Sequence, residues 1–431
     1  MNVFTDLERR AARLGRPVEV GVVGAGFLGG GLVHHLAKIR GMRPAVVANR
    51  TPERALAALA RAGVDPSRIE RTEDPERASR AVEAGRWVVT ASPALPALVP
   101  RVDVVVEATG TLRVGAEVAL EAIRNRKHIV AANPEVMCTV GALLEDRAER
   151  AGVVYTDIDG DQPGIILNLY NWAAGLGLEP VVAGNCKGVL KRYATPKTQE
   201  EFARKAGISP WIATAAADGT KLALEMAIVA NATGMRPVRT GMVGLETKLE
   251  TLLEDFSKAG LLSAGPIVEY TLGIPSGVFV VARSEDPHVR GEFRYLKMGD
   301  GPDYLFYRPY VLCQFETPLT IAEAVLYETP TIAPRGMPTA DVATWAKRDL
   351  RSGERLGPIG GENHYGLVVD RETFRREGCL PVGLAEFAVL RRDVRKDEPV
   401  RLDDVELDEG ELVVRLRREE DRWLSAKAGA A

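Results

Sequence analysis

The chain has 431 residues, of which 46% are hydrophobic and 27% are charged, and its formal net charge is -3. This composition is typical of a globular protein and excludes wholesale disorder, and the length allows two or three domains. A net charge so close to zero provides no global basic field that would attract nucleic acid or acidic membranes. We therefore expect no nucleic-acid partner and a function that depends on local sites.

The cysteines and the N-terminus indicate the compartment. The four cysteines lie far apart with no C-x-x-C pair, and the five histidines have no zinc-binding spacing. The first twenty residues contain early acids and no apolar segment, unlike a signal peptide, and no apolar run is long enough to cross a bilayer. We expect a cytoplasmic, soluble protein with reduced thiols and no membrane contact.

The N-terminal third alternates strands with helices. Residues 1–16 form a predicted amphipathic helix, residues 18–23 a valine-rich strand, and residues 28–39 have helical spacing of apolar side chains. Further strands are predicted at residues 45–48, 87–90, 102–106, 129–132 and 153–156. This alternation predicts an α/β fold with a Rossmann, doubly wound parallel sheet over residues 1–160.

The pattern changes after residue 160. Helices are predicted near residues 163–175, 198–206 and 220–233, and strands at 181–183, 268–272 and 278–282. We expect residues 161–335 to form an α+β domain for catalysis and dimerisation. Prolines near residue 335 interrupt regular structure, and residues 336–431 are predicted to form a small β-rich domain with a charged, helical tail.

A glycine motif follows the first predicted strand. Residues 24–29, Gly-Ala-Gly-Phe-Leu-Gly, fit G-x-G-x-x-G between a strand and a helix, the arrangement that places a pyrophosphate on a helix N-terminus. Gly24 permits the tight turn, Gly26 the close approach of phosphate and Gly29 the packing of helix on strand. Phe27 and Leu28 complete the predicted cofactor contacts. The alternative is a glycine-rich turn without a ligand.

The second strand ends in Asn49, Arg50 and Thr51, where a site that prefers NAD usually has an acid. An acid accepts hydrogen bonds from the ribose 2′-OH and repels a 2′-phosphate, whereas these three side chains can bind that phosphate. The sequence therefore favours NADP(H). In the alternative interpretation, Arg50 is an ordinary surface arginine.

Two later strands end in polar residues at the edge where an open α/β sheet binds ligands. One strand is followed by Ala108, Thr109 and Gly110, and the next ends at Asn133. We expect these four residues to contact the cofactor. The alternative is that Thr109 or Asn133 only caps a helix.

Several of these segments resemble the homoserine dehydrogenase family in order and spacing. They are residues 104–110, residues 127–133 and Asp218-Gly-Thr-Lys221, and the likeness covers roughly residues 18–235. Two positions depart from the family: Pro134 stands where a lysine is usual, and residues 184–193 replace its N-G-T-x-N-Y segment.

A second resemblance spans nearly the whole chain. Residues 161–163, 225–234, 277–282 and 308–310 are similar to homoserine dehydrogenase-like proteins with a C-terminal SAF domain, and residues 346–356 and 390–405 resemble SAF segments. This branch includes 1-deoxyxylulose-5-phosphate reductoisomerase-like enzymes of isoprenoid biosynthesis. The resemblance implies an NADP(H)-dependent oxidoreductase that acts as a homodimer, with the strands near 266–282 in the dimer contact.

Carbonyl reduction needs a proton donor for the developing alkoxide. Lys221 matches the catalytic lysine of the resembled family, and Glu225, one helical turn later, can orient it. A surface Lys–Glu pair is the alternative. Lys187, Lys191 and Arg192 form a basic cluster that either binds a phosphorylated substrate or belongs to a solvated loop. Arg308 is a second candidate for an anionic group, and Asp218 is assigned to the substrate site.

Alternating acids at residues 157, 159 and 161 begin like an EF-hand, but Gln162 replaces the required glycine and Asn168 the bidentate glutamate. An EF-hand is excluded. The acids leave two alternatives: they hold Mg²⁺ or Mn²⁺, or they orient Lys187 and Lys221, with Asp161 in the catalytic group. We assign no metal site and keep the cation as the alternative.

Two classes of function remain. The first is an NADP(H)-dependent carbonyl reductase or reductoisomerase acting on a small polar, phosphorylated substrate, with homoserine dehydrogenase as the nearest alternative. The second is a non-catalytic sensor that binds cofactor and sugar. The glycine motif together with Asp218–Glu225 favours the enzyme.

Overall fold

The computed structural model describes residues 2–334 and 336–430, in which the chain forms two compact units. The first unit contains the residues up to Gly160, the segment Leu312–Ala333 and the residues from Glu409 onward. The second contains Asp161–Val311 and Pro334–Asp408. The layout differs from three consecutive domains, because the segment after Val311 and the C-terminal tail both return to the first unit.

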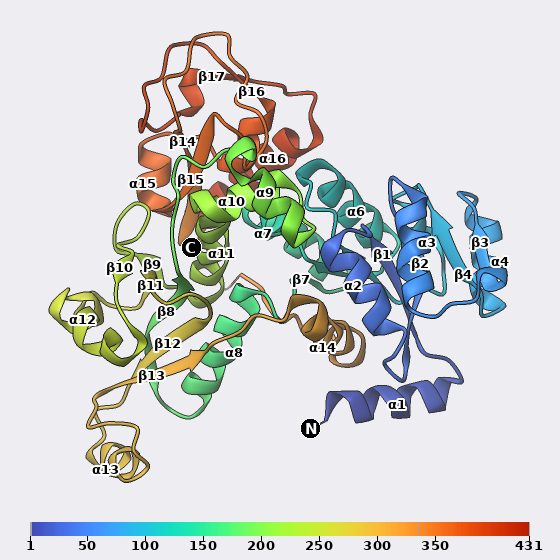
Figure 1. Ribbon diagram of the computed structural model, residues 1–431, viewed down its shortest axis with the longest axis horizontal. Coiled ribbons are helices and arrows are strands. Elements are labelled where there is room, and N and C mark those ends of the chain that lie inside the picture. The colour runs from blue at the N-terminus through green and yellow to red at the C-terminus, as the bar shows by residue number, and fades with distance from the viewer. Residues whose placement is uncertain (1, 335, 431) are drawn as a thin grey trace. The chain divides into compact units, whose positions relative to one another are not determined.

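The first unit contains a seven-stranded parallel sheet, and this confirms the predicted Rossmann fold (Figure 1). The strand order is β3-β4-β2-β1-β5-β6-β7. The strands are β1 Val18–Val23, β2 Met42–Ala48, β3 Ile69–Arg71, β4 Trp87–Thr90, β5 Val104–Glu107, β6 His128–Ala131 and β7 Tyr155–Asp157. Strand order reverses between β1 and β5, so their carboxyl ends border the crevice where such sheets bind ligands.

Helices alternate with these strands, and two further helices come from the end of the chain. They are α1 Val3–Leu14, α2 Phe27–Leu36, α3 Pro52–Arg61, α4 Pro75–Glu83, α5 Leu95–Leu98, α6 Leu112–Arg124, α7 Pro134–Ala151, α14 Cys313–Tyr327 and α16 Leu412–Ala430. Helix α14 packs against α1 and α2, and α16 packs against α6 and α7. A short 3₁₀ turn, η1 Pro66–Arg68, precedes β3.

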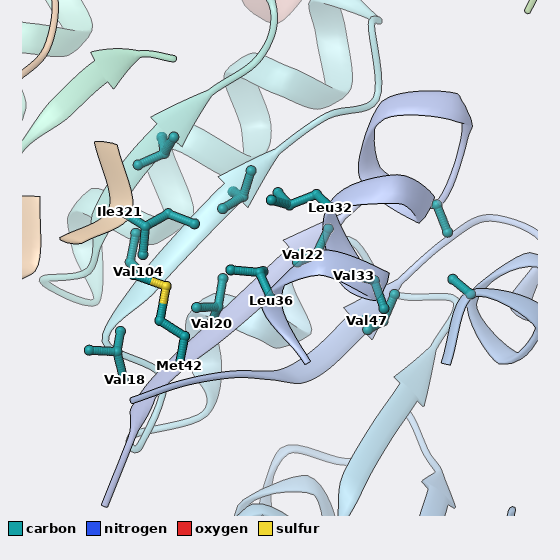
Figure 2. Packing of buried hydrophobic residues seen from close by; sticks show 14 of the residues in the cluster. Val18, Val20, Val22, Leu32, Val33, Leu36, Met42, Val47, Val104 and Ile321 are labelled. Carbon is teal, nitrogen blue, oxygen red and sulfur yellow. The ribbon is translucent and has the colours of Figure 1, made fainter. Parts of the chain in front are cut away.

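The core of the first unit forms where valines of the sheet meet leucines of α2. Figure 2 shows Val20 and Val22 of β1 beside Leu32 and Leu36, and Ile321 of α14 packs near Val104. Every residue of β1 is buried, as is usual for the centre of a parallel sheet, and its one charged residue, Glu19, is paired with Arg43. This packing holds the glycine turn after β1 in place.

The second unit is built on a mixed sheet with strand order β10-β11-β8-β12-β13, in which β9 also pairs with β11. The strands are β8 Glu179–Lys187, β9 Arg236–Pro237, β10 Leu245–Glu246, β11 Ile267–Leu272, β12 Val278–Arg283 and β13 Asp303–Arg308. Strands β8 and β11 run parallel, whereas β12 is antiparallel to both of its neighbours. Strands β11 and β12, which correspond to the strands expected near residues 266–282, therefore have a neighbouring strand on both sides. Two copies of the chain cannot pair through a free edge of either strand.

Helices α8 and α11 pack against each other and against the sheet (Figure 1). The helices of this part are α8 Gln162–Gly175, α9 Pro196–Ala206, α10 Pro210–Asp218, α11 Thr220–Thr233, α12 Leu252–Lys258 and α13 Pro287–Tyr295, with 3₁₀ turns η2 Leu249–Thr251 and η3 Leu261–Ser263. Helix α11 is buried along almost its whole length, which explains why its sequence lacks an amphipathic pattern.

The remainder of the second unit consists of short strands and turns, as predicted. The elements are β14 Ala340–Ala346, β15 His364–Asp370, α15 Arg371–Arg376, η4 Val382–Phe387, β16 Ala388–Leu390, η5 Leu402–Asp404 and β17 Val405–Leu407. The β14–β15 pair packs on α11. Among the residues that the structure describes, no helix combines the length and apolar character needed to span a bilayer.

Candidate functional site

The glycine turn after β1 has the backbone shape that a dinucleotide requires. Gly24 adopts φ 101°, and a Cβ on it would lie 2.5 Å from the carbonyl oxygen of Ala108. A Cβ on Gly29 would lie 1.9 Å from the carbonyl oxygen of Gly24, so only glycine allows α2 to approach the turn. At Gly26, by contrast, no atom lies within 4 Å of a Cβ position. That open space at the N-cap of α2 fits a phosphate group, because the first N–H groups of a helix attract anions.

The end of β2 supports this turn. The side-chain oxygen of Asn49 accepts a hydrogen bond from the backbone N–H of Ala25 at 3.0 Å, and its amide nitrogen donates to the carbonyl of Thr51 at 2.8 Å. Asn49 thus ties the glycine turn to the start of α3, a structural role that the sequence did not indicate. Arg50 and Thr51 are exposed.

A buried carboxylate joins the ends of β5 and β6. Glu107 accepts hydrogen bonds from the backbone N–H of Thr109 at 2.7 Å and from the side-chain hydroxyl of the same residue. The amide of Asn133 donates to the other carboxylate oxygen at 2.8 Å, and its oxygen caps α7. Burial raises the pKa of Glu107, and these hydrogen bonds oppose the rise. Thr109 and Asn133 are therefore held in place by Glu107, a residue that was not predicted for the site.

The second unit brings Lys221, Glu225 and Asp161 together. The Lys221 ammonium lies 3.3 Å from Oε1 of Glu225 and 3.6 Å from Oδ2 of Asp161. The side chain of Lys221 is 29% exposed, whereas those of Glu225 and Asp161 are buried, with exposed fractions of 0% and 7%. Lys221 lies in the first turn of α11 and Asp161 caps α8, so the contact between these two helices creates the cluster. Solvent can therefore reach the amine of Lys221, whereas the two carboxylates beside it are buried.

Further side chains complete the surroundings of Glu225. The Asn185 amide, from β8, donates to Oε2 of Glu225 at 2.8 Å. With its amide nitrogen turned toward the carboxylates, Gln162 donates to Oε1 of Glu225 at 3.2 Å and also to Asp161. Burial raises the pKa of Glu225, while the positive charges of Lys221 and Lys187 lower it. Lys187 thus acts on this cluster electrostatically, and a proton on Glu225 becomes easier to retain than on an exposed glutamate.

Asp218 was predicted for the substrate site. Its side chain is fully buried and forms an ion pair with Lys347 at 2.8 Å. Lys347 also donates to the carbonyls of Ala194 and Gly361, both at 2.7 Å. Asp218 accepts the backbone N–H of Thr220, and burial raises its pKa against the effect of Lys347. These contacts give Asp218 a structural role at the start of α11.

The predicted basic cluster is divided. Lys191 is exposed, and the guanidinium of Arg192 donates to the carbonyl of Asp218 at 3.0 Å and lies 4.9 Å from the centre of the Tyr365 ring. Only Lys187 of the three acts on Glu225. Arg308 lies on the edge strand β13, with its guanidinium 4.6 Å from the centre of the Tyr310 ring.

The alternating acids bind backbone groups. The carboxylate of each accepts the next backbone N–H, at 2.7 Å for Asp157, 2.8 Å for Asp159 and 3.0 Å for Asp161. Within the described part of the chain, no group of three or more His, Cys, Asp or Glu side chains is arranged to hold a metal ion. The residues present thus fit a nicotinamide dinucleotide at the glycine turn, and they give a divalent cation no ready set of ligands.

Four contributors were missed: Glu107, Gln162, Asn185 and Lys347. Glu107 and Gln162 each adjoin a residue that was predicted for the site, so the neighbours of predicted site residues are themselves candidates. Asn185 and Lys347 occur in buried stretches of strand β8 and just after β14, where a polar residue is itself unusual.

The fold and the glycine turn define a nicotinamide-dependent oxidoreductase, and comparison with known proteins agrees. Residues 24–156 match the family described as homoserine dehydrogenase, NAD binding domain, and residues 160–317 match the family described as oxidoreductase DRL, catalytic domain. The chain is thus an NAD(P)-dependent oxidoreductase with a homoserine dehydrogenase-like NAD-binding domain and an oxidoreductase catalytic domain.

Individual relatives are more distant. The chain is 29% identical over 171 residues to homoserine dehydrogenase of Pseudomonas aeruginosa, covering 37% of this chain and 36% of that protein. It is also 29% identical over 172 residues to homoserine dehydrogenase of Methylobacillus glycogenes, covering 37% and 38%. The match therefore spans little more than a third of these curated relatives. Among solved structures, homoserine dehydrogenase from Thiobacillus denitrificans has a TM-score of 0.45 at 16% identity, covering 90% of this chain and 99% of that one.

Proposed function

We propose that this chain is an NADP(H)-dependent reductase of a small polar, phosphorylated carbonyl compound, of the 1-deoxyxylulose-5-phosphate reductoisomerase-like kind. The observation that carries the proposal is the Lys221 ammonium, which is partly exposed and lies 3.3 Å from a fully buried carboxylate of Glu225. An ammonium held in this way can supply a proton to an oxygen that gains negative charge.

A nicotinamide cofactor, when bound, would supply a hydride to the carbonyl carbon of the substrate. The carbonyl oxygen then carries the electron pair of the broken π bond, and Lys221 donates a proton from Nζ to this oxygen to give the alcohol. Neutral Lys221 regains a proton from Glu225 or from solvent, and the burial that raises the pKa of Glu225 favours a proton on that carboxyl group. Asp161, at 3.6 Å, stabilises the charged form of the lysine and orients its amine.

Lys187 supports the choice of a phosphorylated substrate. It ends β8, on the same strand as Asn185, and its positive charge reaches Glu225. A fixed cation beside the proton donor can pair with phosphate oxygens and hold the substrate at Lys221. In a reductoisomerase, rearrangement of the carbon skeleton precedes the reduction, and the same lysine and carboxylates then serve both steps.

NADP(H) is the proposed cofactor because the three residues directly after β2 include no acid. Asn49 is committed to Ala25 and Thr51, so exposed Arg50 is the side chain to bind the 2′-phosphate. We expect Arg50→Ser to weaken NADPH binding about tenfold while NADH binding is unchanged, because one charge-assisted contact is lost. Arg13→Ser, at an exposed arginine of α1, is the matched control, and fluorescence titration measures both affinities. Equal loss for both cofactors would contradict the assignment.

Reduction of aspartate semialdehyde is the second candidate, because two homoserine dehydrogenases match this chain. The first experiment follows the absorbance of NADPH with purified protein and either 1-deoxyxylulose 5-phosphate or aspartate semialdehyde, each with and without Mg²⁺. Turnover of the sugar phosphate supports the proposal, and a Lys187→Ala variant should then show a raised KM. Turnover of aspartate semialdehyde alone would overturn the proposed substrate class in favour of the second candidate.

We also propose that the protein is a cytoplasmic homodimer, with residues 336–408 as a SAF-like part. Because β11 and β12 have neighbours on both sides, a dimer contact through them uses a face of the sheet. Sedimentation equilibrium measures the oligomeric state, and a monomer at micromolar concentration would contradict this proposal.

A further inference from the structure

A hollow on the first unit is lined by an unusual number of arginines. It has a volume of about 600 Å³ and lies between α6, α7 and α16. The arginines that line it are Arg124 of α6, Arg147 of α7 and Arg415, Arg418 and Arg422 of α16. We call this feature the arginine hollow. Its volume falls within the ~300–1,000 Å³ usual for sites that bind small molecules.

The charges of the arginine hollow do not balance. Two carboxylates also line it: Glu419 pairs with Arg147 at 2.5 Å, and Glu409 pairs with Arg418 at 3.0 Å. A third glutamate, Glu121, pairs with Arg124 at 3.4 Å, so the five arginines exceed these three glutamates by two positive charges, although the whole chain has a formal net charge of -3. The positive charge is a local property of these three helices.

The spacing along α16 concentrates this charge on one side. Arg415, Arg418 and Arg422 follow each other at intervals of three and four residues, which places them on one face of the helix, and all three are exposed. Arg418 and Arg422, four residues apart, repel each other on this face, and a bound anion would reduce that repulsion.

The opposite face of α16 fixes the hollow before any ligand binds. Buried Arg417 donates to the carbonyl of Thr139 on α7 at 3.2 Å, and Glu420 accepts the backbone N–H of Leu143 at 2.9 Å. Glu411 at the other end of this region pairs with Arg113 of α6. These contacts hold α16 on both helices, so the arginines are presented from a preformed surface and less ordering is needed on binding.

The position of the hollow separates it from the cofactor turn. Leu120 and Arg124 belong to the last turns of α6, and Arg147 to the last turns of α7. The residues proposed to bind the cofactor lie at or just before the starts of α2, α3, α6 and α7, at the carboxyl edge of the sheet. Three leucines, Leu120, Leu412 and Leu416, also line the hollow and offer an apolar surface beside the arginines.

We propose that the arginine hollow is a second ligand site, which takes a small molecule with two or more linked phosphate groups. Arginine binds phosphate oxygens in a bidentate manner, and five arginines with an excess of two positive charges match a diphosphate or triphosphate better than a single phosphate. The leucines provide a surface for the ring of a nucleotide, although a phosphate chain alone meets the same arginines. The site is independent of the proposed reductase activity.

Isothermal titration calorimetry on the full chain tests this proposal, with inorganic tripolyphosphate, ATP and orthophosphate as probes. We expect tripolyphosphate and ATP to bind and orthophosphate to bind at least tenfold more weakly, since it meets fewer guanidinium groups. Tighter binding of ATP than of tripolyphosphate identifies a nucleotide as the ligand, and equal binding identifies the phosphate chain alone. Both results support the site.

Variants assign the binding to these residues. Arg415→Ser/Arg422→Ser should weaken tripolyphosphate binding at least tenfold, and Arg415→Lys/Arg422→Lys should weaken it too, because lysine cannot form the bidentate contact. Arg9→Ser/Arg13→Ser on α1 is the matched control, and Gly26→Ala tests the glycine turn; neither should change the affinity. Unchanged binding in the Arg415/Arg422 variant, or loss in the Gly26 variant instead, would overturn the proposal. Because binding is measured without turnover, the result does not depend on the reductase assay.

Discussion

The glycine turn of the first unit and the Lys221 cluster of the second are built in opposite ways. The turn uses backbone: Gly24, Gly26 and Gly29 lie within six residues, and their role is to lack a side chain. The cluster uses side chains from α8, β8 and α11, and its carboxylates are buried. A binding surface of backbone N–H groups depends on local geometry, whereas a proton donor depends on neighbours that only the tertiary fold supplies.

The sharpest test of the cluster is Lys221→Ala. We expect turnover to fall by about 10²–10⁴-fold, the usual contribution of a general acid, while NADPH binds to the first unit as before. Stopped-flow measurement of NADPH oxidation gives the rate, and fluorescence titration gives the affinity. Lys205→Ala, at an exposed lysine of α9 in the same unit, is the control and should keep full turnover. Retained turnover in the Lys221 variant would remove this residue from the mechanism.

The difference between the two regions also explains what the sequence could predict. The glycine motif, the strand ends and the helix that begins at Thr220 were all predicted, because each is encoded in a few consecutive residues. The return of α14 and α16 to the first unit was not predicted, since their apolar residues do not specify which elements they pack against. For the same reason, the ion pair between Asp218 and Lys347 could not be predicted from the sequence: these two residues meet only when β14 packs on α11.

The Asp218–Lys347 pair should show how strongly the second unit depends on such contacts. Lys347→Met leaves the fully buried carboxylate of Asp218 without its ion pair, and we expect the free energy of unfolding to fall by about 3–5 kcal/mol. Urea denaturation followed by circular dichroism measures the change. Lys347→Met/Asp218→Leu removes both charges, and it should recover most of the loss. If the double variant is as unstable as the single one, the cost comes from packing or from the carbonyls of Ala194 and Gly361.

A buried histidine in the same region gives stability a defined dependence on pH. His364 is fully buried, and burial lowers its pKa from 6.5 to about 4. Because the unfolded chain binds this proton at a higher pH than the folded chain, stability is present above pH 6.5 and is lost as the pH falls from 6.5 toward 4. The shift corresponds to about 3 kcal/mol.

Urea midpoints at pH 7.5 and pH 5 measure the loss, and comparison with His364→Gln isolates this residue from the carboxylates that titrate nearby. The difference between the urea midpoints at the two pH values should be smaller in His364→Gln than in the unmodified chain. His288→Gln is the control, because His288 is 83% exposed and its replacement should leave the difference unchanged. An identical pH dependence in His364→Gln would assign the loss of stability to other groups.

The two glycines of the turn separate fold from binding within the first unit. In Gly29→Ala the new methyl group meets the carbonyl of Gly24, so the backbone must move, and we expect a loss of about 1–3 kcal/mol in the free energy of unfolding. In Gly26→Ala the methyl group meets no protein atom, so stability should be unchanged. It would, however, occupy the space proposed for the pyrophosphate, and the affinity for NADPH should fall about tenfold.

Thermal denaturation and fluorescence titration of both variants give the four values needed. The expected pattern is that Gly29→Ala loses stability and Gly26→Ala loses affinity alone, because one position is filled by protein and the other is open. If Gly26→Ala binds NADPH as tightly as the unmodified chain does, phosphate does not approach this position closely. The cofactor would then rest on the ends of β2 and β5, and the glycine turn would serve only to pack α2 on the sheet.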